Sequence, residues 1–67
     1  MYSITLKHGS WNKRLYFQST TPSGGFCRYR ALLQEVELIG AISTSMREFS
    51  DRVSALFHDA GFVRIQK

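Results

Sequence analysis

Two segments near the start of the chain, residues 2–7 and 14–19, alternate between apolar and polar positions. Alternation with a period of two is typical of a strand that buries one face. Residues 8–13 between them include glycine and asparagine, which tolerate turn conformations, so we predict an antiparallel hairpin. Tyr2, Ile4, Leu6, Leu15 and Phe17 would form its core face. The opposite face would display Ser3, Thr5, Lys7, Arg14, Tyr16 and Gln18, with Trp11 at the loop tip.

Residues 45–60 give the clearest helical pattern in the chain. Ser45 and Glu48 have the spacing of a capping box, in which each side chain accepts from the other residue's backbone N–H. Gly61 is placed to end the helix. The apolar positions then fall on one stripe, made of Met46, Phe49, Val53, Leu56, Phe57 and Ala60. We predict that this amphipathic helix covers the apolar face of the sheet.

Residues 26–42 fit two patterns. Cys27, Tyr29, Ala31 and Leu33 alternate with more polar neighbours, which favours a third strand over 26–31 followed by a short helix over 32–39. The competing interpretation is helical spacing that ends at Gly40, with the apolar positions Tyr29, Leu32, Leu33, Val36 and Ile39. We prefer the strand followed by the short helix.

Phe62 to Gln66 alternate as a short final strand, and residues 19–25 form an extended loop. Together the elements predict an α+β fold of one domain, residues 1–67. It would be a small two-layer sandwich with an N-terminal β-hairpin, a third strand, one main helix at about 45–60 and a short C-terminal strand. A chain of this length buries only ~60% of its unfolded surface, so a surface function is more readily built than a deep active site.

The composition predicts a cytoplasmic protein that does not enter the membrane. The sequence contains neither a long apolar run nor a basic segment followed by an apolar one, so we expect no membrane span and no secretory signal. Small secreted domains usually carry several disulfides, whereas Cys27 is the single cysteine here.

Charge is distributed unevenly along the chain. Residues 1–30 carry five Lys and Arg residues and no Asp or Glu, whereas residues 31–67 carry four cations and five carboxylates. This asymmetry predicts an acidic partner, although five cations could also be a solvated face without a ligand.

Catalytic chemistry has little support. Cys27 could pair with a histidine as a nucleophile and base, but no motif joins them. His58 and Asp59, with Arg64 and Lys67 as phosphate ligands, form the candidate site of a small ribonuclease toxin. His58 in the last helical turn is explained equally well by the helix dipole. The residues lack zinc-ligand spacing, and we expect no enzyme activity, no metal and no cofactor.

Aromatic and basic residues in the N-terminal half are the candidate binding site. Aromatic residues and arginine are common at protein hot spots, and cations with flat side chains also suit nucleic acid. The predicted partner-binding residues are Lys7, Trp11, Lys13, Arg14, Tyr16, Arg28 and Arg30. We predict a non-catalytic accessory or inhibitor-type protein that docks on an acidic surface of a larger protein or protein complex. The alternative is a small nucleic-acid-binding protein that uses the same face. A homodimer through an exposed edge strand is a third possibility.

Overall fold

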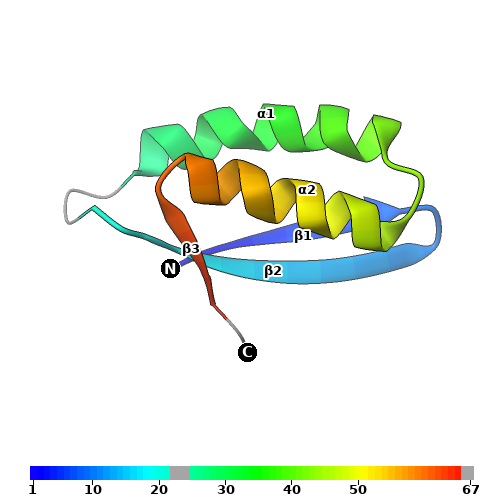
Figure 1. Cartoon of the computed structure of the whole chain (residues 1–67), viewed down its shortest axis with the longest axis horizontal. Coiled ribbons are helices and arrows are strands. Elements are labelled where there is room, and N and C mark those ends of the chain that lie inside the picture. The colour runs from blue at the N-terminus through cyan, green and yellow to red at the C-terminus, as the bar shows by residue number, and fades with distance from the viewer. Residues whose placement is uncertain (22–24, 66–67) are drawn as a thin grey trace.

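The computed structural model describes residues 1–21 and 25–65 of the chain. Five elements follow one another, and each is labelled in Figure 1. They are the strands β1 (Tyr2–His8) and β2 (Trp11–Ser19), the helices α1 (Phe26–Ile42) and α2 (Met46–Asp59), and the strand β3 (Phe62–Ile65). The predicted α+β class is confirmed.

The three strands form one antiparallel sheet in the order β1-β2-β3. In β1 and β2, Ile4 lies opposite Leu15, so the predicted alternation and hairpin are confirmed. The connection is tighter than predicted, because β2 already begins at Trp11 and only Gly9 and Ser10 remain between the strands. Gly9 has a φ of 61°, a left-handed conformation that a side chain would strain.

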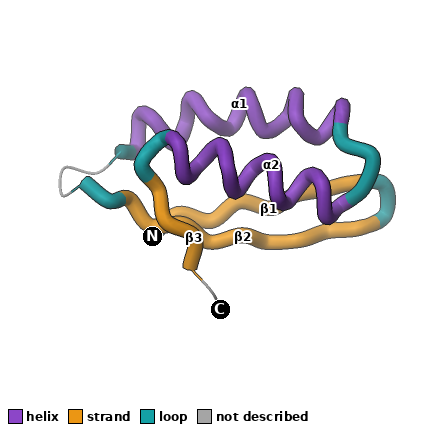
Figure 2. The backbone as a smooth tube through the Cα atoms, in the orientation of Figure 1, coloured by secondary structure: helices purple, strands orange, loops and turns teal. Residues whose placement is uncertain are grey.

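Both helices lie against the same face of the sheet, and within the described residues the opposite face carries no helix (Figures 1 and 2). Helix α2 contacts all three strands, whereas α1 packs on α2 and on the edge strand β1. The two helices therefore have unequal places in the molecule. Helix α2 covers the middle of the sheet, and α1 covers its margin.

Aromatic rings make up much of the core. Phe57 of α2 stacks on Phe17 of β2 with ring centroids 4.3 Å apart, and Phe62 of β3 lies 5.4 Å from Phe57. Tyr2 and Tyr29 stack at 4.6 Å at the margin of this cluster. Aromatic pairs in such arrangements add stability beyond the area they bury. The cluster joins strands and helices into one core.

Helix α1 corrects the prediction for residues 26–42. The segment is one helix from Phe26 to Ile42, and the strand predicted over 26–31 does not form. Leu32 and Val36 are buried, with Tyr29, Leu33 and Ile39 partly buried beside them, which is the competing helical spacing. The alternation was misleading because Cys27 and Ala31 are exposed, on the outer side of the helix.

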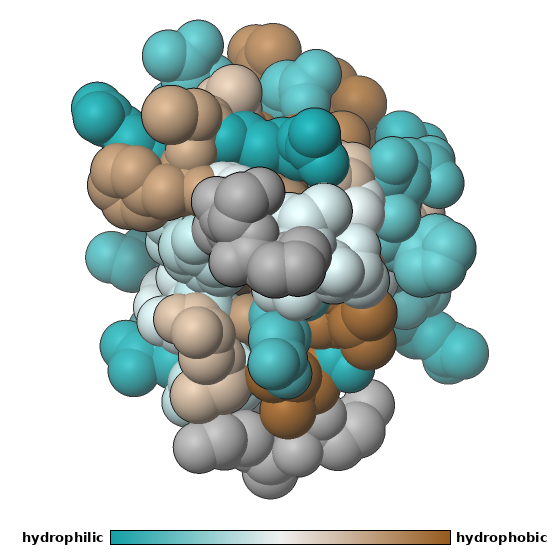
Figure 3. Space-filling model, turned by 90° about the vertical axis from the view of Figure 1, so that its left-hand side faces the viewer, coloured by the Kyte–Doolittle hydropathy of each residue, from teal (hydrophilic) through white to brown (hydrophobic). Residues whose placement is uncertain are grey.

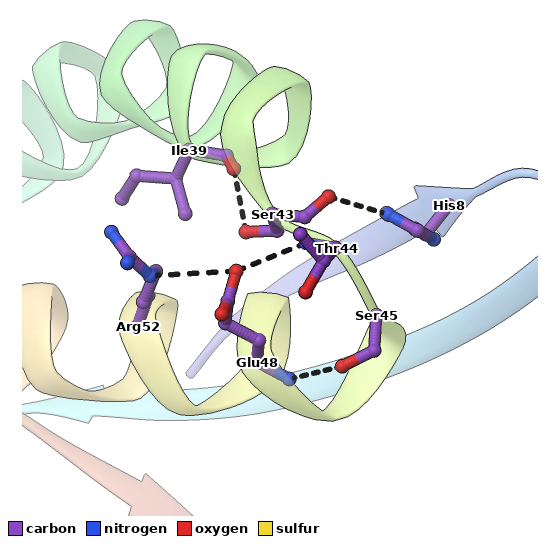
Figure 4. A network of polar contacts seen from close by, with 7 residues as sticks. All are labelled: His8, Ile39, Ser43, Thr44, Ser45, Glu48 and Arg52. Atoms are coloured by element: carbon purple, nitrogen blue, oxygen red, sulfur yellow. Dashed lines mark hydrogen bonds and ion pairs between the residues drawn. The ribbon is translucent and has the colours of Figure 1, made fainter.

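Helix α2 begins with half of the predicted capping box (Figure 4). The Ser45 hydroxyl accepts a hydrogen bond of 3.1 Å from the backbone N–H of Glu48, as predicted. The Glu48 carboxylate, however, accepts from the backbone N–H of Thr44 at 3.0 Å, and not from that of Ser45. The same carboxylate lies 3.8 Å from Nε of Arg52, one turn further along. The cap thus holds the helix and the preceding loop together.

The loop between the helices is tied to the hairpin. His8, at the end of β1, donates from Nε2 to the carbonyl of Ser43 at 2.8 Å (Figure 4). The carbonyl of Ile39, in the last turn of α1, accepts from both the Ser43 hydroxyl at 2.6 Å and the Ser43 backbone N–H at 2.9 Å.

The turn from α2 into β3 is held from two sides. Gly61 has a φ of 92°, and its carbonyl accepts from the backbone N–H of Thr20 at 3.0 Å and from the Thr20 hydroxyl at 2.8 Å. The neighbouring carbonyl, of Ala60, accepts from Nη1 of Arg28 at 2.8 Å. Segments far apart in the sequence therefore meet on two adjacent carbonyls.

Candidate binding surface

The face of the sheet that the helices leave uncovered is here called the open sheet face. Strand register places nine side chains on it, which are Ser3, Thr5, Lys7, Asn12, Arg14, Tyr16, Gln18, Val63 and Ile65. All six residues predicted for this face of the hairpin are among them. The prediction did not place Val63 and Ile65 there, because their side depends on the register of β3 against β2.

One side of the open sheet face, where β3 pairs with β2, is apolar and aromatic. Tyr16 is half-buried and lies opposite Ile65, and Gln18 lies opposite Val63. Val63 keeps 51% of its surface exposed. Arg14 donates from Nε to the hydroxyl of Thr5 at 3.3 Å, which holds its guanidinium over the sheet.

Trp11 and Lys13 lie near the hairpin tip and have the opposite orientation in the strand. Their register partners are His8 and Leu6, so they share the side of the sheet that faces the helices. Trp11 is nevertheless 71% exposed and does not fold back over the core. Among the described residues, β3 pairs with β2 from Tyr16 onward, so no described strand pairs with residues 11–13 on that side. Cations on such an edge also discourage strand pairing between molecules.

Arg28 and Arg30 do not join this surface, which corrects the predicted shared basic face. Both lie on α1, in the other layer and at the end of the molecule away from the hairpin tip (Figure 1). Arg28 is engaged with Ala60, and the Arg30 guanidinium lies 5.9 Å from the centre of the Phe26 ring. The prediction failed because it placed residues 26–31 in a third strand beside the hairpin.

Positive and negative side chains are divided between the sheet and the helical layer more clearly than between the two halves of the sequence. The three strands carry Lys7, Lys13, Arg14 and Arg64 and no Asp or Glu. The two helices carry four arginines and all five carboxylates of the chain, Glu35, Glu37, Glu48, Asp51 and Asp59. The sheet is therefore a cationic layer, and the helical layer has a small net negative charge.

A shallow open groove runs between β1 and α1. Thr5 and Lys7 line it from the strand, and Val36, Glu37 and Gly40 line it from the helix. It exists because α1 sits over the sheet margin and does not close against the outer side of β1. The groove brings Lys7 near a carboxylate of the helical layer.

The catalytic candidates are not assembled into a site. Cys27 is exposed in the first turn of α1, whereas His8 contacts the loop after its last turn, about 24 Å away at 1.5 Å per residue. The side chains of His58 and Asp59 are 81% and 86% exposed and 3.9 Å apart. Arg64 donates to Ser54, and Lys67 lies outside the described residues. Within residues 1–21 and 25–65, no group of three metal-ligating side chains occurs.

Comparison with known proteins gives no family assignment: no family model, curated protein or solved structure matches the chain. In the part of the chain that the structure describes, neither helix has the length and apolar character needed to cross a bilayer. Any function therefore has to be argued from the surface itself.

Proposed function

We propose that this chain is a non-catalytic accessory or inhibitor-type protein that docks by its open sheet face on an acidic surface of a larger protein. The observation that supports this most is the composition of the face: Tyr16 on β2 with Val63 and Ile65 on the neighbouring strand β3, and Arg14 and Lys7 nearer the hairpin tip. No strand contributes a carboxylate. Such a surface attracts an acidic partner and offers apolar area to bury once contact is made.

The apolar residues favour a protein over a nucleic acid as the partner. Single strands bind mainly through rings on which bases stack, and this face presents the branched aliphatic side chains of Val63 and Ile65 as well. We place its action inside the cell, where a single unpaired cysteine, Cys27, is common.

The test is affinity capture from cell extract with matched variants. Arg14→Glu and Val63→Asp alter exposed positions of the open sheet face, and Arg47→Glu alters an exposed position on α2 as the control. We expect the wild type and Arg47→Glu to retain the same protein after nuclease treatment, and the two face variants to lose it. Equal capture by all four proteins would contradict the proposal.

The salt dependence of binding distinguishes a nucleic-acid partner from a protein partner. If capture disappears with nuclease, purified protein should bind single strands with a log–log salt slope of about −3 to −4 for four neutralised phosphates. A protein partner should show a shallower slope and a stronger response to Val63→Asp, because apolar contact is not screened by salt.

A further inference from the structure

The outer side of α1 carries exposed apolar residues although it faces away from the core. Leu38 is 69% exposed and Ile42 is 64% exposed, and both lie on this helix. Figure 3 views the molecule from the end at which α1 begins and shows hydrophobic surface at the top, where α1 lies. The exposed positions recur at alternating intervals of four and three residues and are called the outer α1 stripe: Cys27, Ala31, Gln34, Leu38 and Ala41. This spacing is the seam of a two-helix coiled coil.

Charged residues flank the stripe in an order that the helix itself does not explain. Arg28 and Glu35 flank one side, and Arg30 and Glu37 flank the other. Each arginine precedes its glutamate by seven residues, about 10 Å along the axis, which is too far for an ion pair within the helix. Arginines near a helix N-terminus also oppose the helix dipole. For Glu35 and Glu37 no ion pair is recorded within the described ranges 1–21 and 25–65.

We infer that the outer α1 stripe binds a second copy of this chain, with the two α1 helices antiparallel. Reversing the helix brings the basic end of one stripe beside the acidic end of the other. Arg30 then meets the partner's Glu37, and Arg28 meets the partner's Glu35. The two-fold axis repeats both pairs, so the interface holds four. Arg28 keeps its bond to Ala60, because a guanidinium has further N–H donors.

The same register aligns the stripe. The two charge pairs lie on opposite sides of the seam and are offset from it in opposite directions along the helix axis, so the seam register lies midway between them. Cys27 then faces the partner's Leu38, and Ala31 faces the partner's Gln34. In each contact an a position of one helix faces a d position of the other, as antiparallel helix packing requires.

Charge excludes the neighbouring registers. Sliding one helix by seven residues in one direction places Glu37 against the partner's Glu37, and sliding it the other way places Arg30 against the partner's Arg30. Like charges at these positions destabilise the pair. The interface lies in the helical layer, so it does not occupy the open sheet face.

Charge reversal at one pair tests the register. In Arg30→Glu both members of the pair are acidic, and in Glu37→Arg both are basic, so each variant repels its own copy. We expect sedimentation of the wild type to show a concentration-dependent dimer. Each variant alone should dissociate on the order of tenfold more readily. An equal mixture of the two should recover the wild-type dimer, because the heterodimer has opposite charges at both sites.

Several outcomes would overturn the inference. They are a wild type that stays monomeric up to millimolar concentration, variants that dimerise as the wild type does, or a mixture no tighter than its components. Leu38→Lys serves as a second variant, because an exposed position leaves the fold intact while the seam is lost. A dimer that survives Leu38→Lys would lie elsewhere, for example at a sheet edge.

Disulfide trapping tests the direction of the helices. With an added oxidant, Leu38→Cys should link Cys27 of one copy to the new cysteine of the other. The same substitution in a Cys27→Ala background should not form a disulfide. A parallel pair would instead bring the two Cys27 residues together, so efficient cross-linking of the wild type would contradict the antiparallel arrangement.

Discussion

Helices α1 and α2 lie side by side on one sheet, yet α2 separates its apolar and polar residues more completely than α1 does. Phe49, Val53 and Phe57 of α2 are buried, and its exposed positions include Arg47, Asp51, Arg52, His58 and Asp59. Helix α1 buries Leu32 and Val36 but also exposes Leu38 and Ile42. The helix over the middle of the sheet is thus specified by the core alone. The helix at the margin carries a second apolar surface that the core does not require.

The N-terminal caps of the two helices also differ, and α2 again has the more stabilising arrangement. Helix α2 begins at Ser45, whose side chain accepts from the backbone, whereas α1 begins after Gly25, which has a φ of 103° and offers no side-chain cap. Side-chain caps stabilise a helix by about 1 kcal/mol. We therefore regard α2 as the element that stabilises the sheet, and α1 as the element more open to alteration.

Truncation of core side chains should reveal the largest difference in stability cost between the two helices. Phe57→Ala removes a ring that contacts Phe17 and Phe62, and we expect a loss of about 3–5 kcal/mol of unfolding free energy. This equals the whole net stability of a typical domain of this size, so the variant should be unfolded in water. Leu32→Ala on α1 should cost about 2 kcal/mol and leave a folded protein. Urea denaturation followed by circular dichroism measures both, and equal losses would remove the distinction between the helices.

A substitution where the two helices approach each other closely should have an intermediate effect on stability. A methyl group on Gly40 of α1 would lie 2.8 Å from Cζ of Phe49, whose ring is buried in α2. We expect Gly40→Ala to destabilise the fold by about 1–3 kcal/mol through overpacking, despite the better helix propensity of alanine. Adding Phe49→Leu should make room and recover part of the loss. If Gly40→Ala raises the melting temperature instead, the helices are less tightly packed than described.

The cap of α2 should have the smallest effect of the three. Ser45→Ala leaves the backbone N–H of Glu48 without its acceptor and should cost about 1 kcal/mol. Ser45→Asp keeps an acceptor at the helix start and should stay near the wild type. Thermal unfolding of the three proteins checks this, and an alanine variant as stable as the aspartate one would show that the cap adds nothing.

Local patterns were sufficient to predict the hairpin, α2 and β3. In β3 the alternation predicts the strand but not its buried side, because the apolar Val63 and Ile65 lie on the open sheet face. In the hairpin and α2, one side of the element is buried and the other is mainly polar, so the period along the chain reports the structure. Ile4 opposite Leu15 and the stripe through Val53 are such cases. Helix α1 breaks that condition, because Cys27 and Ala31 on its outer side complete an alternation with Tyr29 and Leu33 on its inner side.

The candidate surface was only half predictable for a related reason. Lys7, Arg14 and Tyr16 belong to a hairpin whose turn fixes the register, so their common face follows from local sequence. Arg28 and Arg30 were assigned to that surface through the incorrect strand. Val63 and Ile65 join it through pairing with residues more than forty positions away, which no local pattern reports.

The two carbonyls between α2 and β3 link the stabilities of the end of β2 and the start of α1. Thr20 holds Gly61 and Arg28 holds Ala60, so opening the turn would release the end of β2 and the start of α1 together. These segments should therefore exchange their amide hydrogens in one cooperative event, although they belong to different layers. The end of the molecule opposite the hairpin tip would then behave as a single unfolding unit.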